Sequence, residues 1–319
     1  MILVATKPKR EKGKRWGKNR KDNRDWKKTN EELVVRGEFL LELGWIKSWD
    51  KELKTMNEGK RGSPYEFPKS LIELQAVWNQ WVSVRGVEGI TRKLVEVAGL
   101  PNYNDYSTIN RRIRKIEPCF ELPTSGSCCA SSDGTGMRMH NAGEYRHIKY
   151  RGKQRRWLKV VITADPNTKD LLKVEVNLDG EGGSESEIAM EHLNELYEKG
   201  IDVLKFWGDG AFDVHDLFNL LEQHSTDSAI PPRDDASNNA KGSMRRAREV
   251  ADYKSKTWDE WAKGKEYGKR WLGTEGIFSS VKGIFGEDTR AKTPKTACLE
   301  AERKFWAYEM IRRYAKTHI

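Results

Sequence analysis

Hydrophobic and polar residues follow two different periods in the C-terminal two-thirds of the chain. Strands are expected around Asp133 and at 158–164, and after a turn the two-residue alternation at 172–178 predicts a third strand. Ser184 and Glu187 then form a capping-box pattern for a helix that ends at Lys199. Further elements are expected as a strand at 203–207, a helix at 213–223, a short strand at 228–230, and helices that begin at Glu275 and Thr296. The pattern predicts an α/β domain at 119–319, a mixed sheet flanked by helices, with a polar insertion at 233–268. The insertion is expected to be a loop with a short helix that touches DNA, or a solvated insertion.

The region before this domain has the three-to-four-residue period of helices. Thr29 and Glu32 form a capping-box pattern for a helix that runs to Leu43, and further helices are expected at 70–84 and 87–97 and from about Ser107. The last of these is basic and contains Arg111 and Arg112. Two helices joined by a break, the second one basic, are typical of a helix-turn-helix that reads the major groove. Residues 29–118 are therefore predicted to be an all-α DNA-binding module, although a basic helix in a purely structural bundle has the same pattern.

Basic residues are concentrated at the N-terminus. The chain has 58 Lys and Arg residues against 48 Asp and Glu, a net charge of +10, and residues 1–30 alone hold twelve basic and three acidic residues. A block with this charge cannot be buried and contacts phosphates by releasing counterions. Residues 1–28 are predicted to be a disordered arm on DNA; a solubilising tail is the alternative.

Three acidic residues, Asp133, Asp209 and Glu275, stand beside predicted strands and at the start of a predicted helix. Two Mg²⁺ ions about 3.5–4 Å apart can activate an attacking oxygen and stabilise a leaving oxygen at a phosphodiester. Mg²⁺ prefers oxygen ligands and needs few carboxylates. Each acid alone is equally well explained by a turn or by the first turn of a helix. Asp259, Glu260, Glu266 and Glu287 compete with Glu275 for the third position. Together the three acids predict a two-metal site for polynucleotidyl transfer.

Four passages give the chain a family resemblance. They are 104–112, 133–136 (Asp-Gly-Thr-Gly), 208–213 (Gly-Asp-Gly-Ala-Phe-Asp) and 267–282. With them the chain resembles DDE transposases of prokaryotic insertion sequences and is most similar to insertion-sequence family five. The resemblance covers about residues 100–316 and implies a ribonuclease-H-like catalytic domain, whose order of strands and helices agrees with the predicted elements.

The last passage resembles the signature Tyr-x2-Arg-x3-Glu-x6-Lys of that family. Here it reads Tyr267, Arg270, Glu275 and Lys282, with four residues rather than three between Arg270 and Glu275. The resemblance implies that Asp133, Asp209 and Glu275 bind two Mg²⁺, for which Mn²⁺ can substitute, and that Tyr267, Arg270 and Lys282 contact DNA. At about 100° per residue, Glu275 and Lys282 share one helical face.

A second basic stretch lies between the first two predicted strands. It includes Arg155 and Arg156 and is interleaved with aromatic residues such as Tyr150 and Trp157. A basic hairpin of this kind beside a metal site is suited to hold a DNA strand for attack. A solvated hairpin whose aromatic rings fold onto the core is the alternative.

The resemblance implies a transposase that cleaves DNA at the ends of an insertion sequence and joins the freed 3′ hydroxyl to target DNA. Its partners are double-stranded DNA, as terminal inverted repeats and as target, and a second copy in a homodimer or higher oligomer. No apolar run approaches the roughly 20 residues of a membrane span, and the expected location is the prokaryotic cytoplasm, with the nucleoid. The alternatives are a site-specific nuclease of the same fold without strand transfer and an inactive DNA-binding protein.

Overall fold

The computed structural model describes residues 25–124, 126–139 and 157–319, and its centre is a five-stranded mixed sheet. The strand order is β3-β2-β1-β4-β5. β1 pairs antiparallel with β2 and parallel with β4; β2 and β3 are antiparallel, and β4 and β5 are parallel. The strands are β1 (Ser127–Arg138), β2 (Trp157–Ala164), β3 (Leu171–Leu178), β4 (Asp202–Trp207) and β5 (Asp227–Ala229).

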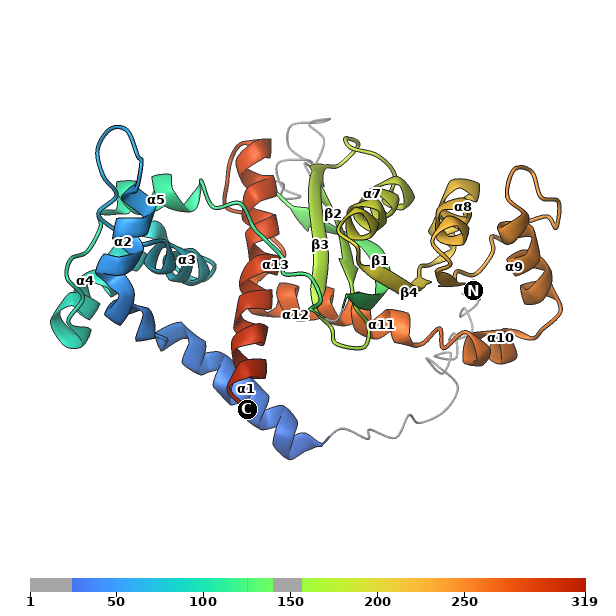
Figure 1. Ribbon diagram of the computed structural model, residues 1–319, viewed down its shortest axis with the longest axis horizontal. Helices are drawn as coiled ribbons and strands as arrows, with labels where there is room; N and C mark the ends of the chain where they lie inside the picture. Colours follow the sequence, from blue (N-terminus) through green and yellow to red (C-terminus); the bar gives the residue numbers. More distant parts are fainter. Residues whose placement is uncertain (1–24, 125, 140–156) are drawn as a thin grey trace, which may run out of the picture.

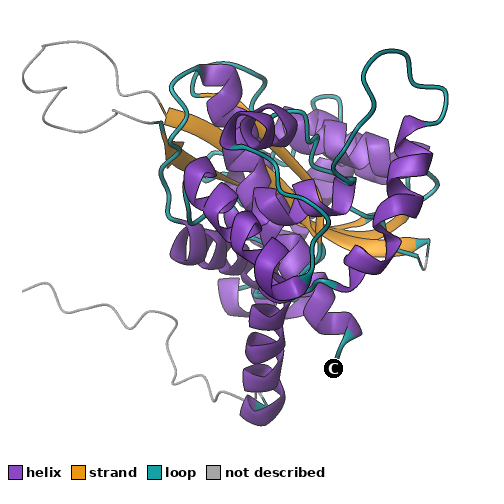
Figure 2. Ribbon diagram, turned by 90° about the vertical axis from the view of Figure 1, so that its left-hand side faces the viewer, coloured by secondary structure: helices purple, strands orange, loops and turns teal. Residues whose placement is uncertain are grey.

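Helices cover both faces of this sheet (Figures 1 and 2). Helices α7 (Glu185–Glu198) and α8 (His215–Gln223) pack on one face, where Leu193 and Phe218 share a buried cluster with Val203 of β4. On the other face, α12 (Glu275–Phe285) and α13 (Pro294–Thr317) form a cluster with alternate residues of β2, such as Leu158, Val160 and Ile162. The sheet order and the two helical layers confirm the predicted ribonuclease-H-like fold.

The N-terminal region is helical, as predicted, but its boundaries differ. α1 begins at Trp26, because the Asp25 side chain accepts hydrogen bonds from the backbone N–H groups of Lys27 and Lys28. Residues 26–28, assigned to the arm, are therefore helical, and the α-helical part ends at Glu38 rather than Leu43. The helices are α1 (Trp26–Glu38), α2 (Trp49–Asn57), α3 (Lys69–Trp78), α4 (Val84–Ala98) and α5 (Tyr106–Ile113), with 3₁₀ turns at Phe39–Leu41 and Gly44–Ser48.

Two of these helices correct the sequence interpretation further. α2 was not predicted at all. The predicted helix at 70–84 ends at Trp78, because Ser83 caps a new helix by accepting a hydrogen bond from the N–H of Gly86 at 3.2 Å.

The N-terminal helices share a core with the α/β domain rather than standing apart from it. Leu71 of α3 and Ile109 of α5 belong to the same buried cluster as Phe305 of α13. The Trp81 indole N–H also donates to the carbonyl of Ile284 at 3.1 Å. In the described ranges, no helix is long and apolar enough to cross a membrane.

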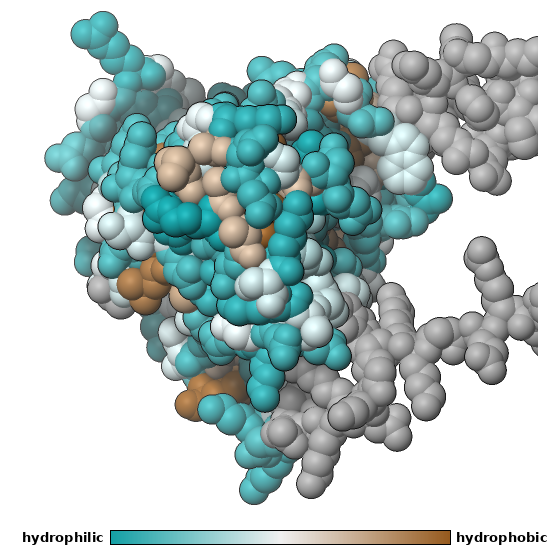
Figure 3. Space-filling model, turned by 90° about the vertical axis from the view of Figure 1, so that its right-hand side faces the viewer, coloured by the Kyte–Doolittle hydropathy of each residue, from teal (hydrophilic) through white to brown (hydrophobic). Residues whose placement is uncertain are grey.

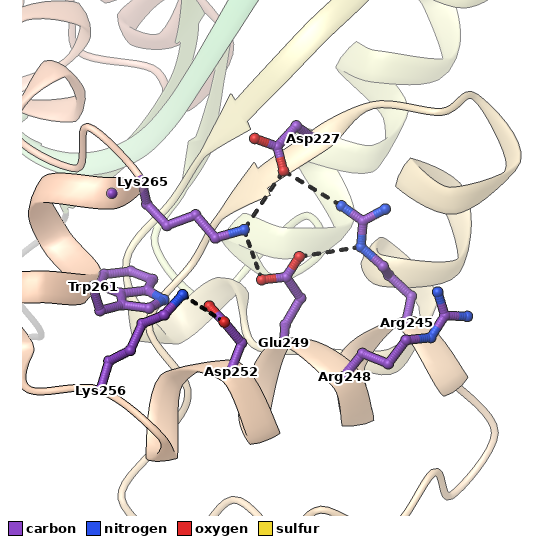
Figure 4. A pocket seen from close by; sticks show the side chains of 9 residues that line it. Asp227, Arg245, Arg248, Glu249, Asp252, Lys256, Trp261 and Lys265 are labelled. Carbon is purple, nitrogen blue, oxygen red and sulfur yellow. Dashed lines mark hydrogen bonds and ion pairs between the residues drawn. The ribbon is translucent and has the colours of Figure 1, made fainter.

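The insertion between β5 and α12 is more ordered than predicted. Instead of a loop with one short helix it contains α9 (Met244–Lys254) and α10 (Trp258–Gly264), followed by α11 (Lys269–Gly273). Asp227 of β5 pairs with Lys265 at 3.5 Å, and Glu249 of α9 pairs with Lys265 at 2.9 Å (Figure 4). Arg245 joins the same network. The surface over α8–α10 is mostly hydrophilic (Figure 3), so charges that suggested a solvated loop instead fix this segment to the sheet edge.

A buried ion pair holds the start of α9 against the catalytic domain. Arg246 donates Nε to Oδ1 of Asp213 at 2.6 Å and an Nη to Oδ2 at 2.7 Å. The Asp213 side chain is 0% exposed and that of Arg246 is 9% exposed. Asp213 also accepts the backbone N–H of Arg233 at 2.9 Å. Removal of either Arg246 or Asp213 would therefore leave the other charge buried and unpaired.

We expect Arg246→Met to lower the free energy of unfolding by about 3 kcal/mol, because Asp213 then stays buried without its cation. Arg248→Met is the matched control on the same helix: its pair with Glu222 has side chains 64% and 42% exposed, and its loss should cost less than about 1 kcal/mol. Urea unfolding of both variants checks this. Equal losses in the two variants would contradict the assignment.

Candidate active site

The strand register brings Asp133 and Asp209 to the same level. In the parallel pair of β1 and β4, Ser131 lies opposite Trp207. Asp133 follows two residues later within β1, and Asp209 follows two residues after Trp207, just beyond the end of β4. Because parallel strands run in the same direction, both carboxylates emerge at the carboxyl end of this pair, the edge at which α/β sheets place ligands.

Asp133 lies in the middle of β1 and is 9% exposed. Its Oδ1 accepts the backbone N–H of Gly134 at 2.9 Å, and its Oδ2 accepts Nη1 of Arg270 at 2.7 Å and the hydroxyl of Thr274 at 3.4 Å. Burial raises the pKa of Asp133, and Asp209 and Glu275 raise it further, against the opposing effect of Arg270. The ionised form of Asp133 is therefore unfavourable in this environment unless a cation lies next to it.

Asp209 is oriented by a tight turn after β4. It caps the 3₁₀ turn Gly210–Phe212 by accepting the N–H of Ala211 at 2.8 Å. Gly208 is required before it, because a Cβ there would lie 2.8 Å from the Phe212 ring. This geometry turns a half-buried carboxylate toward Asp133, whose pKa it raises.

Glu275 and Lys282 lie on the same side of α12, toward β1. Glu275 is the first residue of the helix, and its Oε1 is 3.9 Å from an Nη of Arg270. The Lys282 ammonium donates to the Thr135 hydroxyl of β1 at 2.9 Å. Residues of the opposite stripe are buried, such as Ile277 and Val281, although Ile284 is 41% exposed. The helix thus carries one acid and one cation along the strand that contains Asp133.

Arg270 stands among these acids as their cation. Its guanidinium pairs with Asp133 at 2.7 Å and approaches Glu275 at 3.9 Å, and its side chain is only 13% exposed. Within residues 25–124, 126–139 and 157–319, no three His, Cys, Asp or Glu side chains are gathered closely enough to form a preassembled metal site. The carboxylate oxygens of Asp133, Asp209 and Glu275 are nevertheless the kind of ligand that Mg²⁺ prefers. A cation placed among these neighbouring acids would be attracted by all three.

Tyr267 lies in the core rather than on an open surface. Only 8% of it is exposed, and it packs with Trp207 and Trp261. Its ring lies 5.8 Å from the Arg270 guanidinium carbon. A buried ring is poorly placed for the DNA contact that the sequence comparison implied, whereas its position beside Arg270 suits it to orient that side chain.

Two of the alternative third acids are engaged elsewhere. Glu266 pairs with Lys269 at 2.9 Å and its side chain is 53% exposed; Glu287 pairs with Arg138 at 2.9 Å. Of these glutamates, it is Glu275 that affects the pKa of Asp133.

A further acid, Glu185, was missed by the sequence analysis. It is the first residue of α7, and its carboxyl group lies against Gly134 of β1. Burial raises the pKa of Glu185, and Asp133 and Asp209 raise it further. The only sequence signal was its place inside the Ser184–Glu187 capping box, which was interpreted as a helix start.

The helical region carries the other basic candidates. Asp105 caps α5 by accepting the N–H groups of Ser107 and Thr108. Arg111 is exposed, whereas Arg112 is half-buried, donates to the carbonyl of Phe67 at 3.3 Å and lies 4.5 Å over the Tyr65 ring. Both line a cavity with Tyr103 and Lys115. Arg155 and Arg156 lie outside the described residues, as does most of the basic hairpin.

A family model described as "Transposase DDE domain" matches residues 124–310, more than half of the chain. This range contains Asp133, Asp209, Glu275 and Lys282. No curated protein is significantly similar to the chain.

Among solved structures, the Mos1 strand transfer complex is 10% identical over 80% of this chain and 78% of that chain, with a TM-score of 0.29. A piggyBac transposase synaptic complex with hairpin DNA is 11% identical over 88% of this chain and 81% of that chain, with a TM-score of 0.24. An intasome of simian T-cell lymphotropic virus with a PP2A regulatory subunit is 10% identical over 68% and 74%, with a TM-score of 0.23. Likenesses at these TM-scores decide neither fold nor function.

We expect Arg270→Gln to lower the free energy of unfolding by about 3 kcal/mol near pH 8 in EDTA, because Asp133 then remains buried without its partner. The substitution raises the pKa of Asp133 further. An acid whose pKa is higher in the folded than in the unfolded state destabilises the fold when ionised, so the loss should be complete above the raised pKa and shrink as the pH falls toward the ordinary range.

Urea unfolding near pH 8 and near pH 5 measures this difference. Lys269→Gln is the control, since its pair with Glu266 is exposed. If the two variants behave alike at both pH values, Arg270 does not neutralise Asp133.

Proposed function

The chain belongs to the transposase DDE domain family, and we propose that it cleaves DNA at the ends of an insertion sequence and transfers the freed strand into target DNA. As a DDE transposase it is a polynucleotidyl transferase. The finer parts of the proposal are a prokaryotic element of insertion-sequence family five, terminal inverted repeats as substrate, and a homodimer or higher oligomer acting on DNA at the nucleoid in the cytoplasm.

The observation that supports this proposal most strongly is the common level of Asp133 and Asp209 just beyond the paired stretch of β1 and β4, with Glu275 beside the same arginine as Asp133. We propose that these three carboxylates hold two Mg²⁺ ions, for which Mn²⁺ can substitute. When bound, such ions activate the attacking oxygen and stabilise the leaving oxygen of a phosphodiester.

The surrounding side chains have separate roles in the proposal. Lys282 extends along β1 toward Thr135 and can bind a DNA phosphate beside the acids. Arg270 neutralises Asp133 and Glu275 before cations bind, and it can contact DNA once they do. Tyr267 holds the Arg270 side chain from the protein core. No side chain is required as a covalent nucleophile, because water and the 3′ hydroxyl attack in turn.

We expect Asp133→Asn, Asp209→Asn and Glu275→Gln each to reduce cleavage of a terminal inverted repeat more than about a hundredfold, since each removes part of a charge stabilisation of several kcal/mol. Purified protein is incubated with labelled element ends and Mg²⁺ or Mn²⁺, and the cleaved and joined products are separated on gels.

Glu266→Gln and Glu287→Gln are matched controls, because both glutamates are paired away from the site. Full activity of Glu275→Gln together with loss of activity in either control would remove Glu275 from the site. Cleavage without joining would indicate a nuclease, and sequence-specific binding without any metal-dependent product would indicate a DNA-binding protein.

We also propose that α5 contacts DNA through Arg111, which is exposed, and Arg112, which lines the same cavity. The first expected result is that Arg111→Ala weakens DNA binding about equally for all sequences and lowers the slope of log affinity against log salt by about 1, because one phosphate contact is lost.

Arg112→Ala should differ from it. Arg112 also packs on Tyr65 and donates to the Phe67 carbonyl, so its removal should lower the free energy of unfolding as well. Fluorescence anisotropy at several salt concentrations, with thermal unfolding, separates the two variants. An unchanged salt slope in Arg111→Ala would place DNA elsewhere.

A further inference from the structure

Glu185 meets the catalytic strand at a residue that has no side chain. Gly134 directly follows Asp133 on β1, and a Cβ built on Gly134 would fall within the carboxyl group of Glu185, with Oε2 at 2.9 Å and the other carboxyl atoms closer still. The Glu185 side chain therefore occupies the volume that any other residue at 134 would fill. Neighbouring residues of a strand point to opposite faces, so Glu185 lies on the face of β1 opposite the Asp133 side chain. The charges of Asp133 and Asp209 nevertheless reach it and raise its pKa.

The position of Glu185 is not explained by capping of α7. Ser184 accepts the N–H of Glu187 at 3.3 Å, and the carboxylate of Glu187 accepts the N–H of Ser184 at 2.5 Å. These two bonds complete the capping box. Glu187 is exposed, whereas Glu185 is half-buried and directed toward β1. In the first turn of α7, Glu187 thus caps the helix, whereas Glu185 is directed toward the site.

Glu185 has no hydrogen bond or ion pair with any residue that the structure describes, whereas Asp133 has Arg270. Its neighbours include two further carboxylates, Asp133 and Asp209, and burial and these charges raise its pKa. Lys159 opposes this effect, but its ammonium bonds to the carbonyl of Gly183. A half-buried carboxylate next to like charges is destabilising unless a cation joins it.

We propose that Glu185 is a fourth carboxylate of the divalent-cation site formed by Asp133, Asp209 and Glu275, bound to a cation directly or through one of its water molecules. This inference rests on the proposed function, because it requires the cation site. Mg²⁺ keeps several waters when bound to protein. A carboxylate on the far side of Asp133 from Arg270 can therefore accept a hydrogen bond from one of these waters. The structure gives this role to a glutamate outside the Asp133, Asp209 and Glu275 set.

Binding of Mn²⁺ to the full chain, followed by electron paramagnetic resonance, tests the inference without DNA or turnover. We expect Glu185→Gln to weaken Mn²⁺ binding about tenfold or more, as removal of a ligand or of its hydrogen-bonded partner does. Glu187→Gln, from the same helical turn, should bind Mn²⁺ like the wild type. In EDTA, Glu185→Gln should also have a higher Tm than wild type, because a repelling charge is removed.

A second variant tests the geometry while keeping the charge. Gly134→Ala should displace the flexible end of Glu185 and also weaken Mn²⁺ binding severalfold, with little change in Tm. Gly89→Ala on α4 is its control, since a Cβ at Gly89 meets nothing within 4 Å. This pair keeps the inference testable if Glu185→Gln should fold poorly.

The outcomes separate the two proposals. If Asp133→Asn loses Mn²⁺ binding while Glu185→Gln and Gly134→Ala retain the wild-type affinity, the cation site stands and the role of Glu185 is overturned. If Asp133→Asn itself binds Mn²⁺ like the wild type, the proposed cation site is wrong, and the role of Glu185 is overturned with it.

Discussion

Burial of the Asp133 carboxylate next to other acids is the constraint on which the rest of the site depends. Asp133 is almost fully buried, and Asp209 and Glu275 both raise its pKa. The Arg270 guanidinium, at 2.7 Å, is the cation that balances it. The pKa of Asp133 stays raised despite this arginine, because burial disfavours its ionised form. In the proposed mechanism, divalent cations supply the remaining positive charge, and Arg270 then moves from Asp133 to DNA.

Packing interactions keep the acids of the site close together although their charges repel. The parallel register of β1 and β4 fixes the first two acids, and the buried stripe of α12 fixes the third by packing through Ile277 and Val281. Tyr267, Trp207 and Trp261 close the sheet edge behind Arg270. The insertion is fastened by a buried ion pair and by a charged network at β5 (Figure 4). Electrostatic cost at the site is thus offset by apolar burial on both sheet faces.

Much of this fold could be predicted from the sequence, because its signals are local. Alternation predicted β3, and the capping box of Ser184 and Glu187 placed the start of α7. The failures involve partners that are distant along the chain. α9 looked solvated because Asp213 and Asp227, which pair with its arginines, precede it by many residues. Glu185 was missed because its contact with Gly134 exists only after the sheet and α7 have packed.

The most direct measurement is a crystal structure of the full chain with a terminal DNA end and Mn²⁺, in which anomalous scattering locates the ions. We expect two Mn²⁺ sites bounded by Asp133, Asp209 and Glu275, with the Arg270 guanidinium moved off Asp133 and onto a phosphate. A complex with DNA bound at saturating Mn²⁺, in which Arg270 still pairs with Asp133 and no anomalous peak lies among these acids, would contradict this expectation.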